Sequence, residues 1–175
     1  YNTVIWGVIF MENLDEYLNQ DIFNPKYLFH GSSKLLEKLE PRQSKDKYNA
    51  ENEDCAIFLS SWFINAAAYA FRSKLKEINE YYSFRMNNNG TLPAMEYEVE
   101  NIPENLFGYI YVFKKEEDII KDSYEYTTQY RCYHELEPIK VIKVNFDYFE
   151  KYFQRVEQKQ RKNKIMYINK KDLYI

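Results

Sequence analysis

The second half of this sequence is a succession of short strand patterns. They run over residues 95–100, 109–113, 124–133 and 139–144, and a turn with the sequence Asn-Asn-Asn-Gly-Thr at 87–91 precedes them. Tyrosine, phenylalanine, valine and isoleucine are frequent in these segments, and the first and last alternate apolar with polar residues, as strands do when one face is buried. Strands joined by short connections usually pair in antiparallel order. We therefore expect a largely antiparallel sheet at the centre of the molecule.

The first half of the chain adds helices and two further strands. Leu14, Leu18 and Ile22 have helical spacing, and Pro25 ends that pattern. The apolar run Cys-Ala-Ile-Phe-Leu suits a buried strand. Together the patterns predict helices over 12–23, 62–76 and 146–164, strands over 27–30 and 55–59, and a surface loop over 40–54.

Length and composition are those of one globular domain. The chain has 175 residues, of which 45% are hydrophobic and 18% aromatic, enough to bury a core without disulfides or metals. We find no internal repeat and no composition boundary. The sequence therefore predicts a single α+β domain over 1–175, divided into a leading segment and helix (1–26), a core (27–146) and a C-terminal helix and tail (147–175).

Charge and cysteine content narrow the classes of partner. The net charge of −3 gives no overall attraction to nucleic acid, so such a partner would need a local basic patch. The basic run near 161–164 is interpreted as the solvated end of the last helix, where cations are favoured by the helix dipole. Cys55 and Cys132, with two histidines, match no zinc spacing, so no metal is expected. So few cysteines favour a reducing, cytoplasmic setting.

The beginning of the chain allows two interpretations. Residues 1–10 are apolar and uncharged, but they lack the basic flank of a signal peptide. No apolar run approaches the roughly 18 residues that a membrane-spanning helix needs, so no membrane partner is expected. The first ten residues are either a leading strand or a segment that precedes a natural start at Met11.

A histidine and a glycine stand together where the first apolar strand ends, in Tyr-Leu-Phe-His-Gly-Ser-Ser at 27–33. The imidazole of His30 can donate or accept a hydrogen bond, and the missing Cβ of Gly31 would let a flat ligand lie against main-chain groups. The competing interpretation is an ordinary strand followed by a Gly-Ser turn.

The helix expected over 62–76 has a face of small residues. Ala66, Ala67 and Ala70 would let it lie close to whatever it covers, and Tyr69 would then be the large side chain that projects beside them. In a chain so rich in tyrosine and phenylalanine, aromatic residues such as Tyr69 also fit an ordinary core.

Three segments resemble the ADP-ribosyltransferase fold family, most closely the branch that includes the poly(ADP-ribose) polymerases. The first is Phe-His-Gly-Ser at 29–32. The second is Ala-Ile-Phe-Leu-Ser at 56–60 followed by Ala66, Ala68 and Tyr69, which is similar to the strand-then-helix motif of that branch in order and spacing. The third, Thr-Gln-Tyr-Arg-Cys-Tyr at 128–133, falls where the family has its last catalytic strand. The resemblance covers residues 27–146 and implies split antiparallel sheets with flanking helices.

The resemblance implies that NAD is the co-substrate, cleaved at its nicotinamide–ribose bond through an oxocarbenium-like state. It implies that His30 holds a ribose hydroxyl and that the backbone of Gly31 clamps the carboxamide, with Ser32 beside them. Phe58 and Tyr69 would sandwich the nicotinamide ring. In the loop over 40–54, Arg42 would meet the pyrophosphate, the competing interpretation being a solvated arginine.

Three positions depart from the family pattern. Phe58 stands where that branch has a tyrosine, Ala66 where many relatives have a hydroxyl, and Gln129 where the polymerising members have a glutamate. Gln129 therefore predicts transfer of a single ADP-ribose unit, with the side-chain amide binding the ribose or the acceptor. Glu125 and Glu135 would share a strand face with Gln129 and could supply the missing charge.

Two functions from different classes remain open. The first is a mono-ADP-ribosyltransferase or NAD glycohydrolase, of the kind found among bacterial toxins and phage or defence proteins, acting on a protein, a nucleic acid or a small acceptor. The second is a module of the same fold that binds NAD, ADP-ribose or a nucleic-acid end without turnover. RNA 2′-phosphotransfer on a related fold is disfavoured, because the chain lacks the arginine set that this chemistry uses.

Overall fold

The computed structural model describes residues 8–10, 13–44, 54–78 and 83–156. Its large sheet contains the strands β1 (Val8–Phe10), β2 (Tyr27–Ser32), β3 (Arg42–Gln43), β4 (Cys55–Ser60), β7 (Phe107–Lys114), β8 (Ile120–Lys121), β9 (Gln129–Cys132) and β10 (Lys140–Asn145). A smaller sheet contains β5 (Ser83–Met86), β6 (Met95–Glu98) and β11 (Phe153–Arg155). The helices are α1 (Asp15–Leu18), α2 (Phe63–Ile78) and α3 (Phe146–Phe149), followed by the 3₁₀ turn η2 (Glu150–Tyr152).

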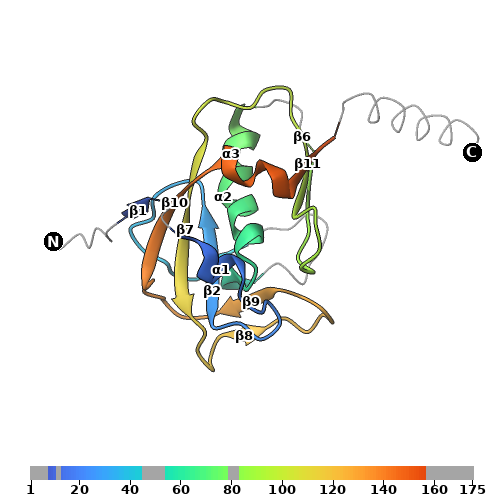
Figure 1. The fold of residues 1–175 in the computed structure, drawn as a ribbon. Coiled ribbons are helices and arrows are strands. Elements are labelled where there is room, and N and C mark those ends of the chain that lie inside the picture. Colours follow the sequence, from blue (N-terminus) through green and yellow to red (C-terminus); the bar gives the residue numbers. More distant parts are fainter. Residues whose placement is uncertain (1–7, 11–12, 45–53, 79–82, 157–175) are drawn as a thin grey trace, which may run out of the picture.

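The protein is α+β with mostly antiparallel sheets (Figure 1). The strand order of the large sheet is β1-β10-β7-β2-β4-β9-β8, with β3 paired to β4, and that of the smaller sheet is β11-β6-β5. Within the described residues, only the β1–β10 and β11–β6 pairs are parallel. The expectation of a largely antiparallel sheet is confirmed.

Helix α2 lies between the two sheets and organises the main core (Figure 1). On β7, Ile110 and Val112 face this core, whereas Tyr111 and Phe113 face a second core on the opposite side of the large sheet. Because both faces of the central strands are buried, their sequences read as continuous apolar runs.

Two glycines let α2 approach the large sheet closely. A Cβ added to Gly31 on β2 would lie 1.9 Å from the carbonyl oxygen of Ala66, and one added to Gly108 on β7 would lie 2.7 Å from the Cβ of Ala70. The small-residue face expected for this helix is confirmed. The missing side chain of Gly31 makes room for the helix, so the idea that a ligand fills that space is wrong.

Two predicted helices are wrong in extent. The helix expected over 12–23 is the single turn α1 within the described residues. The helix expected over 146–164 ends at Phe149, and after η2 the chain becomes β11, which pairs with β6 through Phe153 and Met95. Phe149 and Phe153 are both buried in the main core, so their helical spacing reflects burial and not a continuous helix. The basic run near 161–164 lies outside the described residues.

Other segments differ in smaller ways. Of the strand pattern over 124–133, only Gln129–Cys132 is a strand, and residues before it form a loop. The leading-strand interpretation holds for Val8–Phe10, which pairs with β10, whereas Met11 lies outside the described residues. No helix in the described part of the chain is long and apolar enough to cross a membrane.

Candidate functional site

Strands β2 and β4 touch at one point and then diverge. They pair only through Phe29 and Ser60, after which β2 continues along β7 and β4 continues along β9. The ring of His30 lies at this divergence, and its Nδ1 donates to the carbonyl oxygen of Phe58 at 2.8 Å. A main-chain carbonyl that a neighbouring strand would normally bind is therefore bound by an imidazole.

The contact with Phe58 fixes the tautomer of His30. Because the carbonyl can only accept, the neutral ring carries its proton on Nδ1 and leaves Nε2 as an acceptor. Burial lowers the pKa of His30 below its ordinary value, and the nearby charge of Arg42 lowers it further, although the hydrogen bond to Phe58 opposes both. At neutral pH the ring is an uncharged acceptor, the form that can bind a hydroxyl group.

This shifted pKa predicts a pH dependence of stability. Below pH 6.5, the ordinary value, the unfolded chain takes up a proton that the folded His30 resists, so the free energy of unfolding falls as the pH drops from about 6.5 toward the folded pKa. Urea unfolding of wild type and His30→Asn over about pH 5–7.5 tests this. We expect the variant to lose less stability than wild type over that range.

His134 provides a control of opposite sign. Its hydrogen bonds to the Glu135 carbonyl and to Asp118 raise its pKa, so its contribution is present at low pH and lost as the pH rises. His134→Asn should therefore leave the acid-side loss of stability in place or enlarge it. Equal pH profiles for wild type and His30→Asn would contradict the prediction.

The seven residues expected to form the site lie on neighbouring elements: His30, Gly31 and Ser32 on β2, Arg42 on β3, Phe58 on β4, Tyr69 on α2 and Gln129 on β9. Strand β2 lies beside β4, β4 lies beside β9, and α2 packs on β2. Ser32 is used locally, because its hydroxyl donates to the carbonyl of Lys34 and accepts from the Lys34 N–H. Arg42 is exposed and Tyr69 half-buried.

Phe58 is already stacked on one side. The guanidinium of Arg131, directly opposite on β9, lies 5.0 Å from the centre of the Phe58 ring. Such a cation–π contact stabilises both groups. A ligand ring could therefore stack only on the face of the Phe58 ring that Arg131 does not cover.

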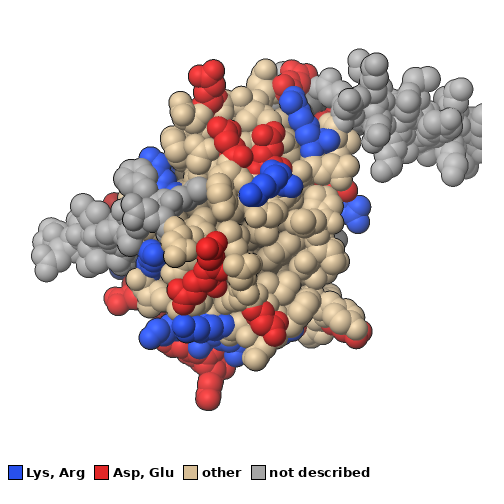
Figure 2. Space-filling view, viewed as in Figure 1, with Lys and Arg blue, Asp and Glu red and all other residues tan. Residues whose placement is uncertain are grey.

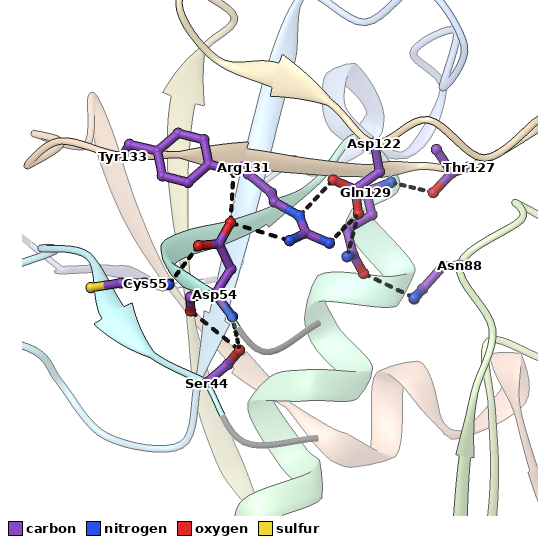
Figure 3. Close-up of polar contacts among 9 residues, drawn as sticks. All are labelled: Ser44, Asp54, Cys55, Asn88, Asp122, Thr127, Gln129, Arg131 and Tyr133. Atoms are coloured by element: carbon purple, nitrogen blue, oxygen red, sulfur yellow. Dashed lines mark hydrogen bonds and ion pairs between the residues drawn. The ribbon is translucent and has the colours of Figure 1, made fainter. Parts of the chain in front are cut away.

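Gln129 belongs to a polar network that sequence spacing did not predict (Figure 3). Its Nε2 donates to Oδ2 of Asp122 at 2.6 Å, and its Oε1 accepts from Nδ2 of Asn88 at 3.1 Å. Asn88 in turn accepts from Nδ2 of Asn65 on α2 at 2.9 Å. Both ends of the Gln129 amide are thus engaged, which fixes its orientation.

The same network continues through two carboxylates and one guanidinium (Figure 3). Nε of Arg131 donates to Oδ1 of Asp122 at 2.7 Å, and one of its terminal nitrogens lies 3.3 Å from Asp54. The hydroxyl of Tyr133 donates to Asp54 at 2.7 Å, which is the main reason that the pKa of Asp54 is lowered. Asp122 raises the pKa of Arg131. Formally, the three charged groups sum to −1.

Asp122 is the functional candidate that sequence analysis missed. It faces Gln129 across the β8–β9 hairpin, where its N–H donates to the Gln129 carbonyl at 3.0 Å. Glu125 and Glu135, the acids expected beside Gln129, lie outside β9, so the shared strand face is wrong. Glu125 nevertheless lines the same cleft as Gln129. The only sequence signal for Asp122 is that it precedes the turn of a hairpin, which is weak.

A cleft of about 540 Å³ opens on the loop side of Gln129. Its walls are the turn between β5 and β6 and the loop between β8 and β9, and of the seven expected site residues only Gln129 lines it. Within the described residues, no group of three or more histidine, cysteine, aspartate or glutamate side chains could hold a metal ion.

The chain was compared with protein-family models, with curated proteins and with solved structures, and no significant match was found in any of the three comparisons.

Proposed function

We propose that this protein binds NAD where β2 and β4 diverge and transfers single ADP-ribose units to an acceptor. The observation that carries the proposal is the placement of His30. Its ring lies at the divergence, with Nδ1 committed to the Phe58 carbonyl and Nε2 left as an acceptor for a hydroxyl such as that of a ribose. Gly31, next in the strand, offers its backbone at the same point.

In this proposal the aromatic groups bind the nicotinamide end. Phe58 would contact the ring with the face that Arg131 does not cover, and Tyr69 would come from α2, the helix that packs on Gly31. Stacking of this kind contributes about 0.5–1.5 kcal/mol beyond the area buried. The second candidate function, binding without turnover, uses the same contacts.

The negative charge that the family pattern places at residue 129 would come from Asp122. Its carboxylate lies 2.6 Å from the Gln129 amide, and together with Asp54 and Arg131 it gives the network a formal charge of −1. A net anionic group stabilises a developing oxocarbenium ion, and more strongly where water is excluded. Gln129→Glu is therefore a poor gain-of-function variant, because its new carboxylate would face Asp122.

A ligand screen and a nicotinamide-release assay test the proposal. Saturating NAD, at about 100 times its dissociation constant, should raise the unfolding free energy by roughly 2.7 kcal/mol, a shift of about 5–10 °C in Tm.

In the activity assay, wild type should release nicotinamide without forming polymer. His30→Ala should lower kcat/KM by about 2- to 10-fold or more, because a hydrogen bond to a ribose hydroxyl is lost.

His134→Ala is the matched control, since this histidine is exposed and bonds to Asp118 outside the expected site. It should leave Tm shifts and turnover unchanged. If NAD, nicotinamide and ADP-ribose all fail to move Tm, the nucleotide-site proposal is wrong. Binding of NAD without nicotinamide release would favour the binding module.

A further inference from the structure

We propose that the cleft beside Gln129 binds an unpaired nucleobase. This inference goes beyond the proposed function, because Gln129 is the one expected site residue that lines the cleft and base binding there needs no NAD chemistry. The cleft has a volume of about 540 Å³, within the range of small-molecule sites. Its walls are the end of β5 and the turn that follows it (residues 85–89, 91 and 93) and residues 124–127 of the β8–β9 loop, with Glu96 and Gln129 at its sides.

The lining is dominated by neutral hydrogen-bonding groups. Three consecutive asparagines at 87–89, two threonines and Gln129 contribute amides and hydroxyls. The amides of Asn88 and Gln129 already bond to each other, to Asn65 and to Asp122. A base edge would therefore bind the second proton or lone pair that each amide end retains. The opposite charges of Arg85 and Glu96 form an ion pair at 3.7 Å and cancel each other. Glu125 also lines the cleft, so its charged side chains sum formally to −1. The cleft is therefore suited to a flat, polar ligand whose inserted part carries no negative charge.

The two walls are held in place before any ligand arrives. Asn89 Oδ1 accepts from the N–H and the hydroxyl of Thr91, and Asn87 Oδ1 accepts from the Asn89 N–H. The N–H of Thr128 donates to the Asn88 carbonyl at 2.7 Å, which joins the turn to the β8–β9 loop. A cleft whose walls are already ordered loses little conformational entropy on binding.

Exposed aromatic rings stand at the mouth of the cleft. Tyr126 lines it and is 64% exposed, and Phe23, 47% exposed, packs edge-on against Tyr126 at 6.4 Å. The backbone of Tyr126 has φ 61°, a conformation that non-glycine residues adopt infrequently. Aromatic rings that remain exposed beside a polar cleft are the platforms on which unpaired bases stack.

The charges near the cleft do not form a phosphate site, because Glu125 lines the cleft and Arg85 is paired with Glu96. The ammonium of Lys121 lies 5.7 Å from the Phe23 ring, and neither of these two residues lines the cleft. The face seen in Figure 2 carries acidic and basic side chains side by side, without a basic stripe. Affinity should therefore come from the base, and binding should depend less on salt than phosphate-driven binding does.

Titration of the ¹⁵N-labelled 175-residue chain tests this inference. The probes are UMP, CMP and a single-stranded oligouridylate, which contain no adenine and so do not imitate NAD. We expect shifts of the side-chain amide signals of the three asparagines at 87–89. Tyr126→Ala should weaken binding by about 5- to 150-fold, the effect of one lost stacking contact, whereas Tyr126→Phe should bind like wild type.

Tyr148→Ala is the matched control, because Tyr148 is 40% exposed but does not line the cleft. It should leave nucleotide affinity unchanged. Much tighter binding of the oligouridylate than of UMP would identify single-stranded nucleic acid as the source of the base, and similar affinities would identify a free nucleotide.

Several results would overturn the inference. They are the absence of any shift with all three probes, shifts with glucose or a short peptide only, and equal losses in Tyr126→Ala and Tyr148→Ala. His30→Ala is expected to keep its affinity for UMP. A failure of NAD binding alone therefore contradicts the proposed function and leaves the cleft inference standing.

Discussion

Gly31→Ala should destabilise the protein strongly. The added Cβ would lie 1.9 Å from the carbonyl oxygen of Ala66 and 2.9 Å from the backbone nitrogen of Ala70, so α2 as a whole would have to move. Overpacking costs about 1–3 kcal/mol where side chains can adjust, and more where they cannot. We expect a loss of at least about 3 kcal/mol, measured by urea unfolding.

Gly108 supplies a matched comparison under the same helix. There the added Cβ would meet the Cβ of Ala70 at 2.7 Å, so Ala70→Gly should relieve part of the damage caused by Gly108→Ala. Ala66→Gly should not relieve Gly31→Ala, because the obstacle is a carbonyl oxygen. Wild-type stability of Gly31→Ala would contradict the close approach of helix and strand.

Arg131→Met should be the second strongly destabilising change. The side chain of Arg131 is 13% exposed and that of Asp122 only 6%, and removal of one partner from a buried ion pair usually costs about 3–5 kcal/mol. Met keeps much of the aliphatic bulk but leaves the charge of Asp122 without its cationic partner. We expect a loss of about 3 kcal/mol in the free energy of unfolding.

Arg85→Met is the control for a generic loss of positive charge. Its side chain is 83% exposed and its ion pair with Glu96 measures 3.7 Å, so the change should cost no more than about 1 kcal/mol. Asp122→Asn added to Arg131→Met should recover part of the loss, because the uncompensated charge disappears. Similar losses in Arg131→Met and Arg85→Met would show that the buried network contributes little.

The parts of the fold that follow from local sequence were predictable. β7 buries side chains on both faces, and β10 buries its three apolar side chains. Helix α2 carries a long apolar surface with a face of alanines. Such patterns depend on neighbours in the chain, so they are visible without a structure. The antiparallel centre of the molecule followed from the succession of these strands.

The C-terminal part was mispredicted because distant pairing decided its conformation. Phe149 and Phe153 are spaced as on a helix, yet Phe153 pairs with Met95 in the smaller sheet. The four-residue spacing of Phe149 and Phe153 indicates only that both rings lie in the same core. Which backbone conformation brings them there depends on a partner strand elsewhere in the chain.

The candidate site was predictable only in part, for a similar reason. His30, Gly31 and Phe58 lie on strands that the sequence marks clearly, and the structure brings them to neighbouring positions. The link from Gln129 to Asp122 depends on the register of the β8–β9 hairpin, in which Lys121 opposes Tyr130. Loops carry no periodicity, so neither that register nor the cleft beside it could be predicted from residue spacing.

The position of β2 in the sheet has a consequence for protein synthesis. Its long partner β7 begins only at Phe107, so a ribosome must translate for on the order of ten seconds more before β2 can pair along its length. Until then β2 is an apolar segment with an unpaired edge. Exposed segments of this kind are bound by chaperones. Contacts of such large sequence separation also slow folding. Substitutions that weaken β7 should therefore lower the yield of folded protein while the molecules that do fold retain their site.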